Sequence, residues 1–280
     1  MKTTMQTSNW QCRVANSLGN GFAGTVEDAW GTLPYTDDTA PTCFFGLYGL
    51  PDFYALWRHK GRKAILWAGS DIRHFKDGYW LDEVGDIRLN PTALADWINR
   101  NCENYVENGV EQKALRNMGI LSKVVPSFLG NVDDYSVNYE WSDRPKVYAS
   151  VSGDDFKLYK WDKIEELAVA NPEVAFHLYG NTQPWSSFCK NITVHGRVPQ
   201  EQMNSEIKDM QGGLRLLDHD GFSEVIAKSL LWGQYPISTI PYPGCLSVDQ
   251  IATLKDKTEP NHKGREWLLS VVNKYVWNTK

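Results

Sequence analysis

Short apolar runs alternate with segments of helical pattern along most of this chain, and a turn-forming stretch separates each run from the next helix. Residues 43–49 are predicted to form a buried strand, residues 51–61 a helix that begins near Pro51, and residues 63–71 a strand that ends in a Gly-Ser-Asp turn. The pattern continues with a helix at 91–101, a strand at 102–108, a helix at 110–119 and a strand at 122–128. Such alternation is typical of α/β proteins with parallel sheets.

Residues 130–144 interrupt this pattern, because they are acidic and polar and show no periodicity. The pattern then restarts, with strands predicted at 146–153, 174–181, 191–198, 212–220 and 235–239 and helices at 161–172, 199–210, 221–231, 247–257 and 264–278. A chain of 280 residues is long enough for two such domains. We therefore predict an N-terminal domain at 1–130, a linker at 131–145, a C-terminal domain at 146–258, and a C-terminal helix within 259–280 that packs back on the N-terminal domain.

The composition predicts a soluble cytoplasmic protein. No run of eighteen apolar residues occurs, and residues 1–11 are polar, without the apolar segment of a signal peptide. The five cysteines are scattered, and none forms a CxxC pair, which predicts reduced thiols and no zinc site. No HExxH motif or histidine cluster occurs, and the "DHD" at 218–220 is a weak metal signal, so we expect no metal.

Positive charge is concentrated in one stretch of this acidic chain, whose net charge is −5. The cations of this stretch are Arg58, Lys60, Arg62, Lys63, Arg73 and Lys76, and its one acid is Asp71. A net charge of −5 argues against a general nucleic-acid coat, but a local surface of this kind favours an anionic partner.

Glycines at 19, 21 and 24 lie between a short apolar segment and a helical pattern, with GxGxxG spacing. Glycines in that position allow a backbone to approach a phosphate at a helix N-terminus. The preceding run is short and polar, and no ribose-binding acid follows at the expected distance. Two interpretations therefore stand side by side: a tight turn, or a contact with a donor phosphate through Gly19 and Gly21.

The second half carries three segments in a characteristic order: "VAFHLYGN", "NITVHGRVPQEQM" and "LRLLDHDGFSEVIAKSLLWGQYPIST". A weaker set precedes them, "WAGSDI" at 67–72 and the stretch 106–128. Over residues 43–240 the chain resembles the retaining family-four glycosyltransferases of the glycogen-synthase-like superfamily, in the compact form found in bacteriophage DNA-modifying enzymes. The resemblance implies the GT-B fold, with two Rossmann-like domains facing a cleft and a short N-terminal domain.

The resemblance also assigns roles to two positions eight residues apart. In the family, an E-x7-E motif places one acid on the transferred sugar and a second on the ribose hydroxyls. Here Asp220 and Lys228 occupy these positions, and lysine donates hydrogen bonds but cannot accept them. Asp220 has an alternative role as a helix N-cap, Lys228 has one on a solvated helix face, and Glu224 is a possible substitute for the missing acid.

Further donor-binding residues follow from the same comparison. We expect the backbone amides of Gly221, Phe222 and Ser223 to open a helix and to face the donor diphosphate. The strand-ending loops contribute Gly153, Lys157, Lys160, Gly180 and Arg197, with Arg215 as a further cation. Asp71 is predicted as a catalytic base beside the cleft, or alternatively as the cap of a turn.

These features predict a metal-independent, retaining transferase that uses a nucleotide sugar, with UDP-sugar first among the donors, and no cofactor. The basic stretch suggests an anionic acceptor, and the resemblance suggests a hydroxymethylated base in DNA, which such an enzyme would reach by base flipping. A lipid-linked or small glycan acceptor is the alternative. An epimerase or phosphorylase would need a catalytic acid pair or a pyridoxal lysine, whereas a non-catalytic sugar-binding module remains open.

Overall fold

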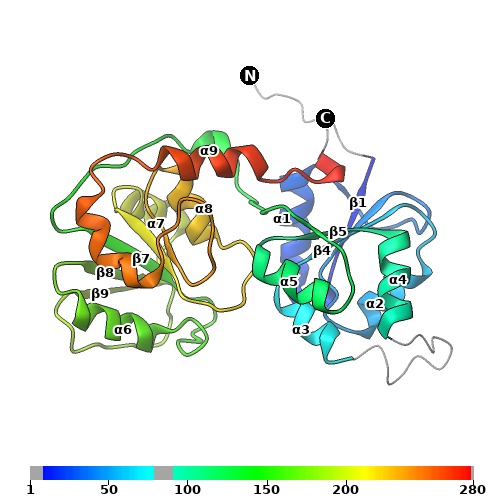
Figure 1. Cartoon of the computed structure of the whole chain (residues 1–280), viewed down its shortest axis with the longest axis horizontal. Coiled ribbons are helices and arrows are strands. Elements are labelled where there is room, and N and C mark those ends of the chain that lie inside the picture. The colour runs from blue at the N-terminus through cyan, green and yellow to red at the C-terminus, as the bar shows by residue number, and fades with distance from the viewer. Residues whose placement is uncertain (1–8, 79–90, 279–280) are drawn as a thin grey trace. The chain divides into compact units, whose positions relative to one another are not determined.

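The computed structural model describes residues 9–78 and 91–278, and these form two α/β units (Figure 1). Unit 1 contains the described residues up to Asn131, the short stretch His219–Gly221, and the residues from Val271 onward. Unit 2 contains Val132–Asp218 and Phe222–Ser270. In the described part of the chain, no helix is both long and apolar enough to cross a membrane.

The sheet of unit 1 is parallel, with the strand order β2-β1-β3-β4-β5-β6. Its strands are β1 (Gln11–Val14), β2 (Leu33–Pro34), β3 (Thr42–Phe45), β4 (Lys63–Trp67), β5 (Cys102–Val106) and β6 (Lys123–Val124). β3 is fully buried, β4 is buried from Ala64 to Trp67, and both are nearly continuous in apolar residues, as expected for a parallel sheet covered on both faces.

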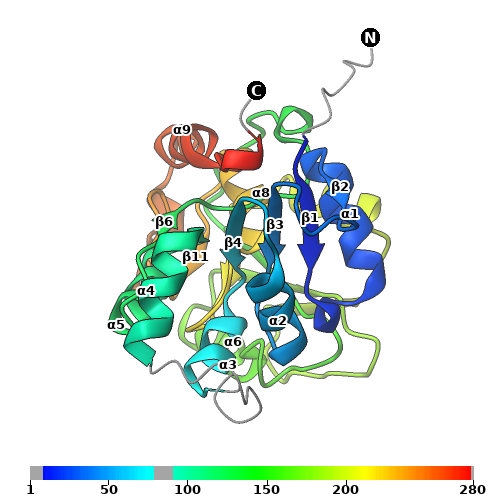
Figure 2. The same ribbon diagram turned by 90° about the vertical axis from the view of Figure 1, so that its right-hand side faces the viewer.

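Alternate side chains of these strands serve two separate cores. Phe44, Ile65 and Trp67 face four helices, α2 (Leu50–Arg58), α3 (Ser70–Lys76), α4 (Pro91–Asn101) and α5 (Gly109–Asn117). Cys43, Phe45 and Leu66 face α1 (Asn20–Trp30) and the C-terminal residues. Figure 2 shows β1, β3 and β4 side by side with α2 in front of them.

The predicted helix at 264–278 is wrong as a single element. The structure has α9 (His262–Val271) and a separate 3-10 turn, η4 (Val276–Asn278). Asn273 separates them because its φ of +54° is left-handed, and its side chain binds the backbone of Phe128, with Nδ2 donating at 2.7 Å and Oδ1 accepting at 2.9 Å. Beyond it, Tyr275 and Trp277 stack with centroids 4.4 Å apart inside the core of unit 1.

Replacing Asn273 by alanine is expected to lower the free energy of unfolding by about 2–3 kcal/mol, because two hydrogen bonds and a tolerated left-handed residue are lost. Asn273→Gly removes the same hydrogen bonds but accepts the backbone angle, so it should cost about 1 kcal/mol less than alanine. Urea unfolding of both variants measures the difference. Equal losses would show that the backbone angle at Asn273 carries no cost.

The sheet of unit 2 is also parallel, with the order β11-β10-β7-β8-β9. Its strands are β7 (Lys146–Ser150), β8 (Ala175–Tyr179), β9 (Ile192–Gly196), β10 (Gly212–Arg215) and β11 (Ile237–Ser238). One face packs against α6 (Trp161–Ala170) and the 3-10 helix η3 (Val248–Asp256), and the other packs against α7 (Gln200–Ile207) and α8 (Glu224–Leu231). The segment of η3 was predicted as an α-helix. Both sheets confirm the predicted α/β class with Rossmann-like topology.

Each sheet has one point at which the strand order reverses. In unit 1 the chain moves from β1 to β2 on one side and then places β3 on the other. In unit 2 it runs through β7, β8 and β9 before returning to place β10 on the opposite side of β7. In open parallel sheets, ligands bind at the carboxyl ends of strands at such reversal points. The loops after β1 and β3, and after β7 and β10, are therefore the places to look for a site.

Candidate functional site

The reversal point of unit 2 brings together two of the predicted donor-binding segments. The loop after β7 holds Gly153, with φ +71°, and the predicted cations Lys157 and Lys160. β10 ends at Arg215, whose guanidinium lies 4.8 Å from the centroid of the Tyr159 ring in that same loop. Lys157 is exposed, and Lys160 is the left-handed residue that precedes α6. This edge therefore carries three cations at the place where a parallel sheet binds an anionic ligand.

The loop after β8 is tied to the loop after β7 by Asp154. Its carboxylate accepts hydrogen bonds from the backbone amides of Thr182, at 2.6 Å, and Gln183, at 3.2 Å. A hydrogen bond from the Thr182 hydroxyl, followed by those from the Thr182 and Gln183 amides, lowers the pKa of Asp154. Gly180 has φ +96°, and a Cβ added to it would lie 2.3 Å from the carbonyl oxygen of Val151. Gly180 is therefore required for close packing of the two loops, whatever its contact with a donor.

Helix α8 begins later than predicted. Its N-cap is Ser223, whose hydroxyl accepts from the amide of Val225 at 3.2 Å, so the alternative role of Asp220 as the N-cap is wrong. The expectation that the amides of Gly221 and Phe222 open the helix is also wrong, because both residues precede it. The Phe222 side chain is buried, with its ring centroid 5.1 Å from that of Tyr242.

Lys228 is buried, which excludes its alternative position on a solvated helix face. Its Nζ lies 3.4 Å from Oε2 of Glu224, one turn earlier on α8, and 3.4 Å from Oδ1 of Asn204 on α7. Every residue of α8 from Val225 to Leu231 is buried, so the cation is held in place by packing as well as by its partners. Glu224 is engaged with Lys228 on its own helix, which counts against a separate role in replacing the missing ribose acid.

Asp71 lies in the first turn of α3 and not in a turn after β4, because the helix already begins at Ser70. Its side chain is fully buried, and Oδ2 accepts from the amide of Leu47 at 3.0 Å. Oδ1 has no hydrogen-bond partner among the described residues. Burial raises the pKa of Asp71 to about 6, with backbone hydrogen bonds opposing the rise. A pKa near neutrality suits the predicted general base, although the carboxyl group is enclosed.

Three polar residues after β5 were missed in the sequence analysis. Glu107 and Asn108 follow the strand directly, and Glu111 lies in the first turn of α5. All are almost completely buried, with exposures of 4%, 1% and 3%. Burial, followed by the charges of Glu107 and Asp71, raises the pKa of Glu111 to about 10, so its carboxyl group is protonated at neutral pH. The signal was present, because Asn-x-x-Glu after a strand is a helix-start pattern.

The stretch His219–Gly221 belongs to this edge of unit 1. Asn108 Nδ2 donates to the carbonyl oxygen of Asp220 at 2.7 Å. A Cβ added to Gly221 would lie 2.1 Å from Oε2 of Glu107, so only glycine fits there without displacement. Asp220 and Gly221, predicted as catalytic and donor-binding residues, are thus held by residues that the prediction did not include.

The predicted glycines at the start of α1 lie at the reversal point of unit 1. Gly19 is the N-cap of α1 with φ +87°, and Gly21 lies within the first turn of the helix. No described atom would lie within 4 Å of a Cβ at either position. The backbone there is open on one side, which fits both interpretations, a turn and a phosphate contact.

The basic stretch 58–76 does not form one surface. Arg58, Lys60, Arg62 and Lys63 precede or begin β4, whereas Arg73 and Lys76 follow it on α3. The five residues of β4 separate the two groups by about 16 Å, at roughly 3.3 Å per residue. Lys60 pairs with Asp38 at 3.0 Å, and Arg62 pairs with Glu103.

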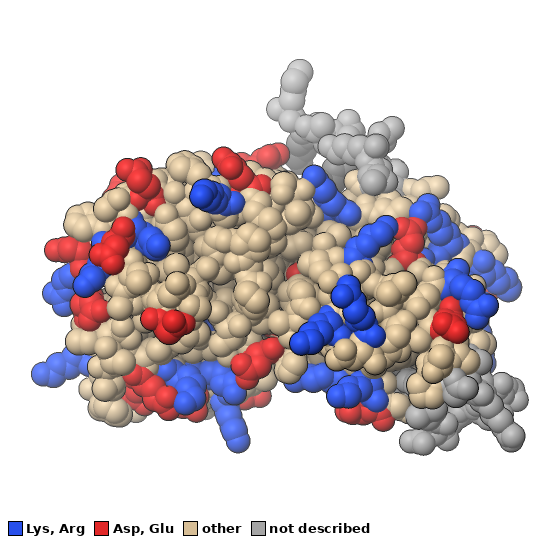
Figure 3. Space-filling view, in the orientation of Figure 1, with Lys and Arg blue, Asp and Glu red and all other residues tan. Residues whose placement is uncertain are grey.

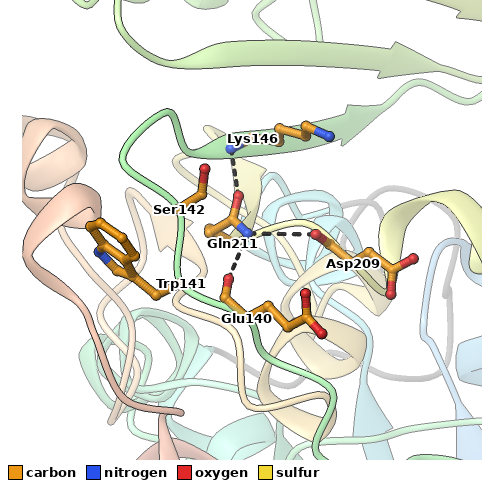
Figure 4. Close-up of a pocket in the computed structure, with 6 residues that line it drawn as sticks. All are labelled: Glu140, Trp141, Ser142, Lys146, Asp209 and Gln211. Atoms are coloured by element: carbon orange, nitrogen blue, oxygen red, sulfur yellow. Dashed lines mark hydrogen bonds between the residues drawn. The ribbon is translucent and has the colours of Figure 1, made fainter.

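A polar pocket of about 430 Å³ lies elsewhere in unit 2 (Figure 4). It is lined by Glu140, Trp141, Ser142, Lys146, Asp209 and Gln211. The Gln211 side chain bridges its walls, accepting from the Lys146 amide at 2.7 Å and donating to the Glu140 carbonyl at 2.8 Å. Lys146 begins β7, so this pocket opens at the amino ends of the strands and not at the edge where the ligand is expected.

Polar side chains on β8, β9 and α7 bond to one another in unit 2. Nδ1 of His177 lies 2.9 Å from Nε2 of His195, and the Tyr179 hydroxyl donates to Glu206 at 2.8 Å. Burial, with the neighbouring His195, lowers the pKa of His177 to about 4. The two imidazoles bond to each other, and among the described residues no three potential ligands are placed to hold a metal ion.

Solved structures that are similar to this chain identify the fold. HepE from Anabaena, in complex with UDP-glucose, matches with a TM-score of 0.51 at 11% identity, over 96% of each chain. TarM from S. aureus, in a complex that contains UDP, matches with a TM-score of 0.56 at 14% identity. The chain has the GT-B fold.

This GT-B chain spans about half the length of some of the proteins that it matches. It covers 54% of TarM, and 55% of the pneumococcal O-GlcNAc transferase GtfA, which it matches with a TM-score of 0.51 at 10% identity. The match with TarM covers 86% of the GT-B chain, and the match with GtfA covers 84% of it. No model of a known protein family matches, and no curated protein is similar in sequence.

Proposed function

We propose that the chain transfers a sugar from a nucleotide sugar, a UDP-sugar first among them, to a hydroxyl acceptor. The observation that carries this proposal is the reversal point of unit 2, where Arg215 at the end of β10 lies over Tyr159, a residue of the same loop after β7 that contains Lys157 and Lys160. Cations there neutralise the charge that develops on a leaving diphosphate. HepE, which is described in complex with UDP-glucose and is matched over 96% of both chains, supports the same donor class.

In this proposal the reaction retains the configuration of the sugar and needs no metal ion. Asp220 binds hydroxyl groups of the transferred sugar, because a carboxylate accepts several hydrogen bonds. The lysines of the loop after β7 stabilise the leaving diphosphate, together with the predicted contacts of Gly153, Gly180, Arg197 and Ser223. Asp71, with its pKa raised to about 6, is the proposed base for an acceptor hydroxyl.

The test is a panel of uridine, guanosine, cytidine and thymidine sugar nucleotides. A UDP-sugar at 100 times its Kd should stabilise the folded chain by about 2.7 kcal/mol and so raise its Tm by several degrees. The double variant Lys157→Ala, Lys160→Ala should lose most of this shift, while Lys163→Ala on the outer face of α6 should keep it. If no nucleotide sugar changes the Tm, the proposal is wrong.

Lys228 is proposed to donate to the donor nucleotide at the ribose or phosphate. Lys228→Met keeps the packing of the stem and removes the charge, so we expect about tenfold weaker UDP-sugar binding, the value of one charge-assisted hydrogen bond. The variant Lys228→Glu is a less direct test, because it would place a second carboxylate one helical turn from Glu224. Calorimetric titration measures the affinity, and Glu224→Gln controls for loss of the ion pair. If Lys228→Met binds the UDP-sugar as tightly as the wild type or more tightly, the proposed contact of Lys228 is wrong.

As the acceptor we propose a phosphate-bearing molecule, with a hydroxymethylated base in DNA as the specific case. The support comes from α3 and α5, which are in contact at the carboxyl ends of β4 and β5. Among the described residues, the exposed charged side chains of these helices are Arg73, Lys76, Lys113 and Arg116, and Asp77, directly after α3, is the one exposed acid beside them. Figure 3 shows Lys and Arg gathered over the part of unit 1 where Figure 1 labels these helices. A net positive surface at the expected acceptor edge favours a polyanion.

Changing Lys76, Lys113 and Arg116 together to alanine is expected to weaken DNA binding and to reduce the slope of log K against log salt by up to about 3, since each lost phosphate contact contributes about 0.9. Arg73 is left in place because its charge acts on Glu111. Fluorescence anisotropy over a salt series gives the slope. Changing Arg58, Lys60 and Arg62 together to alanine tests in the same way whether the other end of the basic stretch binds DNA. If both sets leave the slope unchanged, DNA is not the acceptor.

A further inference from the structure

The carboxyl ends of β4 and β5 hold three buried carboxyl groups. Asp71, Glu107 and Glu111 are each exposed by 4% or less. Arg73, which lowers the pKa of Glu111, is exposed on α3. Burying a carboxyl group is costly unless its surroundings compensate for the lost hydration. The contacts that these side chains make at this edge are therefore the place to look for their role.

Glu111 is the member with the fewest bonds. Neither of its carboxyl oxygens has a hydrogen-bond partner among the described residues. Its Oε1 lies 2.9 Å from the position that a Cβ of Gly69 would take, and the amide nitrogen of Gly221 lies 3.0 Å from that same position. Gly69 itself has φ +97°, a conformation that other residues rarely adopt. The absence of a side chain at Gly69 thus lets the Asp220–Gly221 peptide and the Glu111 carboxyl group approach the end of β4 together.

Asn108 connects the same peptide to α5. Its Oδ1 caps the helix by accepting from the Glu111 amide at 3.0 Å, and its Nδ2 donates to the Asp220 carbonyl at 2.7 Å. The side chain is 1% exposed, so both bonds are shielded from water. On the other side of the peptide, the Glu107 carboxylate occupies the space that a side chain at Gly221 would need. The peptide is therefore bonded by Asn108 and packed against Glu107 and Gly69, which lie at the ends of β5 and β4 and do not belong to its own loop.

We propose that Asn108 and Glu107 are positioning residues that hold the Asp220–Gly221 peptide at the carboxyl ends of β4 and β5, and thereby fix Asp220 for its contact with the transferred sugar. The proposal rests on the proposed function for the role of Asp220, but the holding of the peptide is independent of any reaction. A misplacement of about 1 Å in a reacting group costs about 100-fold in rate, so residues that hold Asp220 are expected to affect turnover strongly.

The test uses Asn108→Ser in the full chain. Serine still caps α5, because its hydroxyl accepts from a backbone amide, but it is too short to reach the Asp220 carbonyl. Asn99→Ser is the matched control, since the Asn99 side chain also joins two segments of unit 1, binding Gly119 and Leu121 far from this edge. Hydrogen exchange of the peptide that covers residues 217–223 is measured in both variants, together with kcat and the donor KM.

We expect Asn108→Ser to speed hydrogen exchange in residues 217–223 by about tenfold or more, because one buried hydrogen bond is lost. The amides of α5 should keep their protection from exchange. In the transfer reaction, kcat should fall by about tenfold to 100-fold with the donor KM changed less than about threefold. Asn99→Ser should show neither effect. Unchanged exchange in Asn108→Ser overturns the proposal. Faster exchange in a chain whose wild type transfers no sugar leaves the positioning intact and shows instead that the proposed function is wrong.

Discussion

Gly180→Ala is expected to destabilise unit 2 by about 3–5 kcal/mol and to abolish the Tm shift caused by a nucleotide sugar. The new Cβ would lie 2.3 Å from the Val151 carbonyl oxygen, and the backbone angle of +96° adds strain of its own. The loops after β7 and β8 must therefore separate, which moves the proposed donor-binding edge. Urea unfolding and thermal shift with UDP-sugars give the two quantities.

Gly153→Ala is the matched control for this change. Gly153 also has a positive φ, +71°, and lies in the same pair of loops, but no described atom would meet its Cβ within 4 Å. It should cost only the backbone strain, about 1–2 kcal/mol. A loss as large as that of Gly180→Ala would show that contact with Val151 is not the cause.

Glu111→Gln is expected to make the protein more stable than the wild type, by a margin that grows with pH. The carboxyl group of Glu111 has its pKa raised from 4.5 to about 10 in the folded chain. Between these values the folded state holds a proton that the unfolded state has lost, so wild-type stability falls as pH rises, by up to about 1.4 kcal/mol per pH unit. Glutamine keeps the shape of the protonated acid and removes this dependence.

The charged groups around Glu111 determine the pH range in which its effect on stability is best measured. Glu107, Asp71 and Asp220 raise its pKa and Arg73 lowers it. Asp71, with a pKa raised from 3.8 to about 6, adds a loss of the same sign at lower pH, so the clearest window lies between about pH 7 and 9. Urea unfolding across this window compares Glu111→Gln with the exposed control Asp96→Asn. Parallel curves for Glu111→Gln and the wild type would show that Glu111 is ionised in the folded chain.

Much of the fold could be predicted from the sequence because apolar periodicity is a local property. The helix at 91–101 has the predicted bounds, and most other strands and helices lie within the predicted ranges. The errors occur where long-range contacts override local preference. Gly69-Ser70-Asp71 has the residues of a turn, yet the left-handed Gly69 lets α3 begin at once. Asn273 ends α9 because its side chain binds Phe128, a residue 145 positions away.

The candidate site was harder to predict than the fold. A solvated helix face was one of the two alternatives for Lys228, but α8 is buried from Val225 to Leu231, and only packing against α7 shows this. Glu107, Asn108 and Glu111 resemble an ordinary helix start, and their burial together with Asp71 depends on two neighbouring strands ending at the same edge. The contact of Asn108 with Asp220 joins residues 112 positions apart, which no local pattern indicates.

The composition of unit 1 has a consequence for how the chain folds during synthesis. Tyr275 and Trp277 complete the same core as Trp30 and Phe45, although nearly the whole chain separates them. A ribosome that has released only residues 1–131 has therefore delivered every described strand of this sheet without Tyr275 and Trp277, which complete its second core. Domains usually fold in the order in which they are made. Here unit 2 can finish first, and unit 1 must wait for residues 275–277 to emerge.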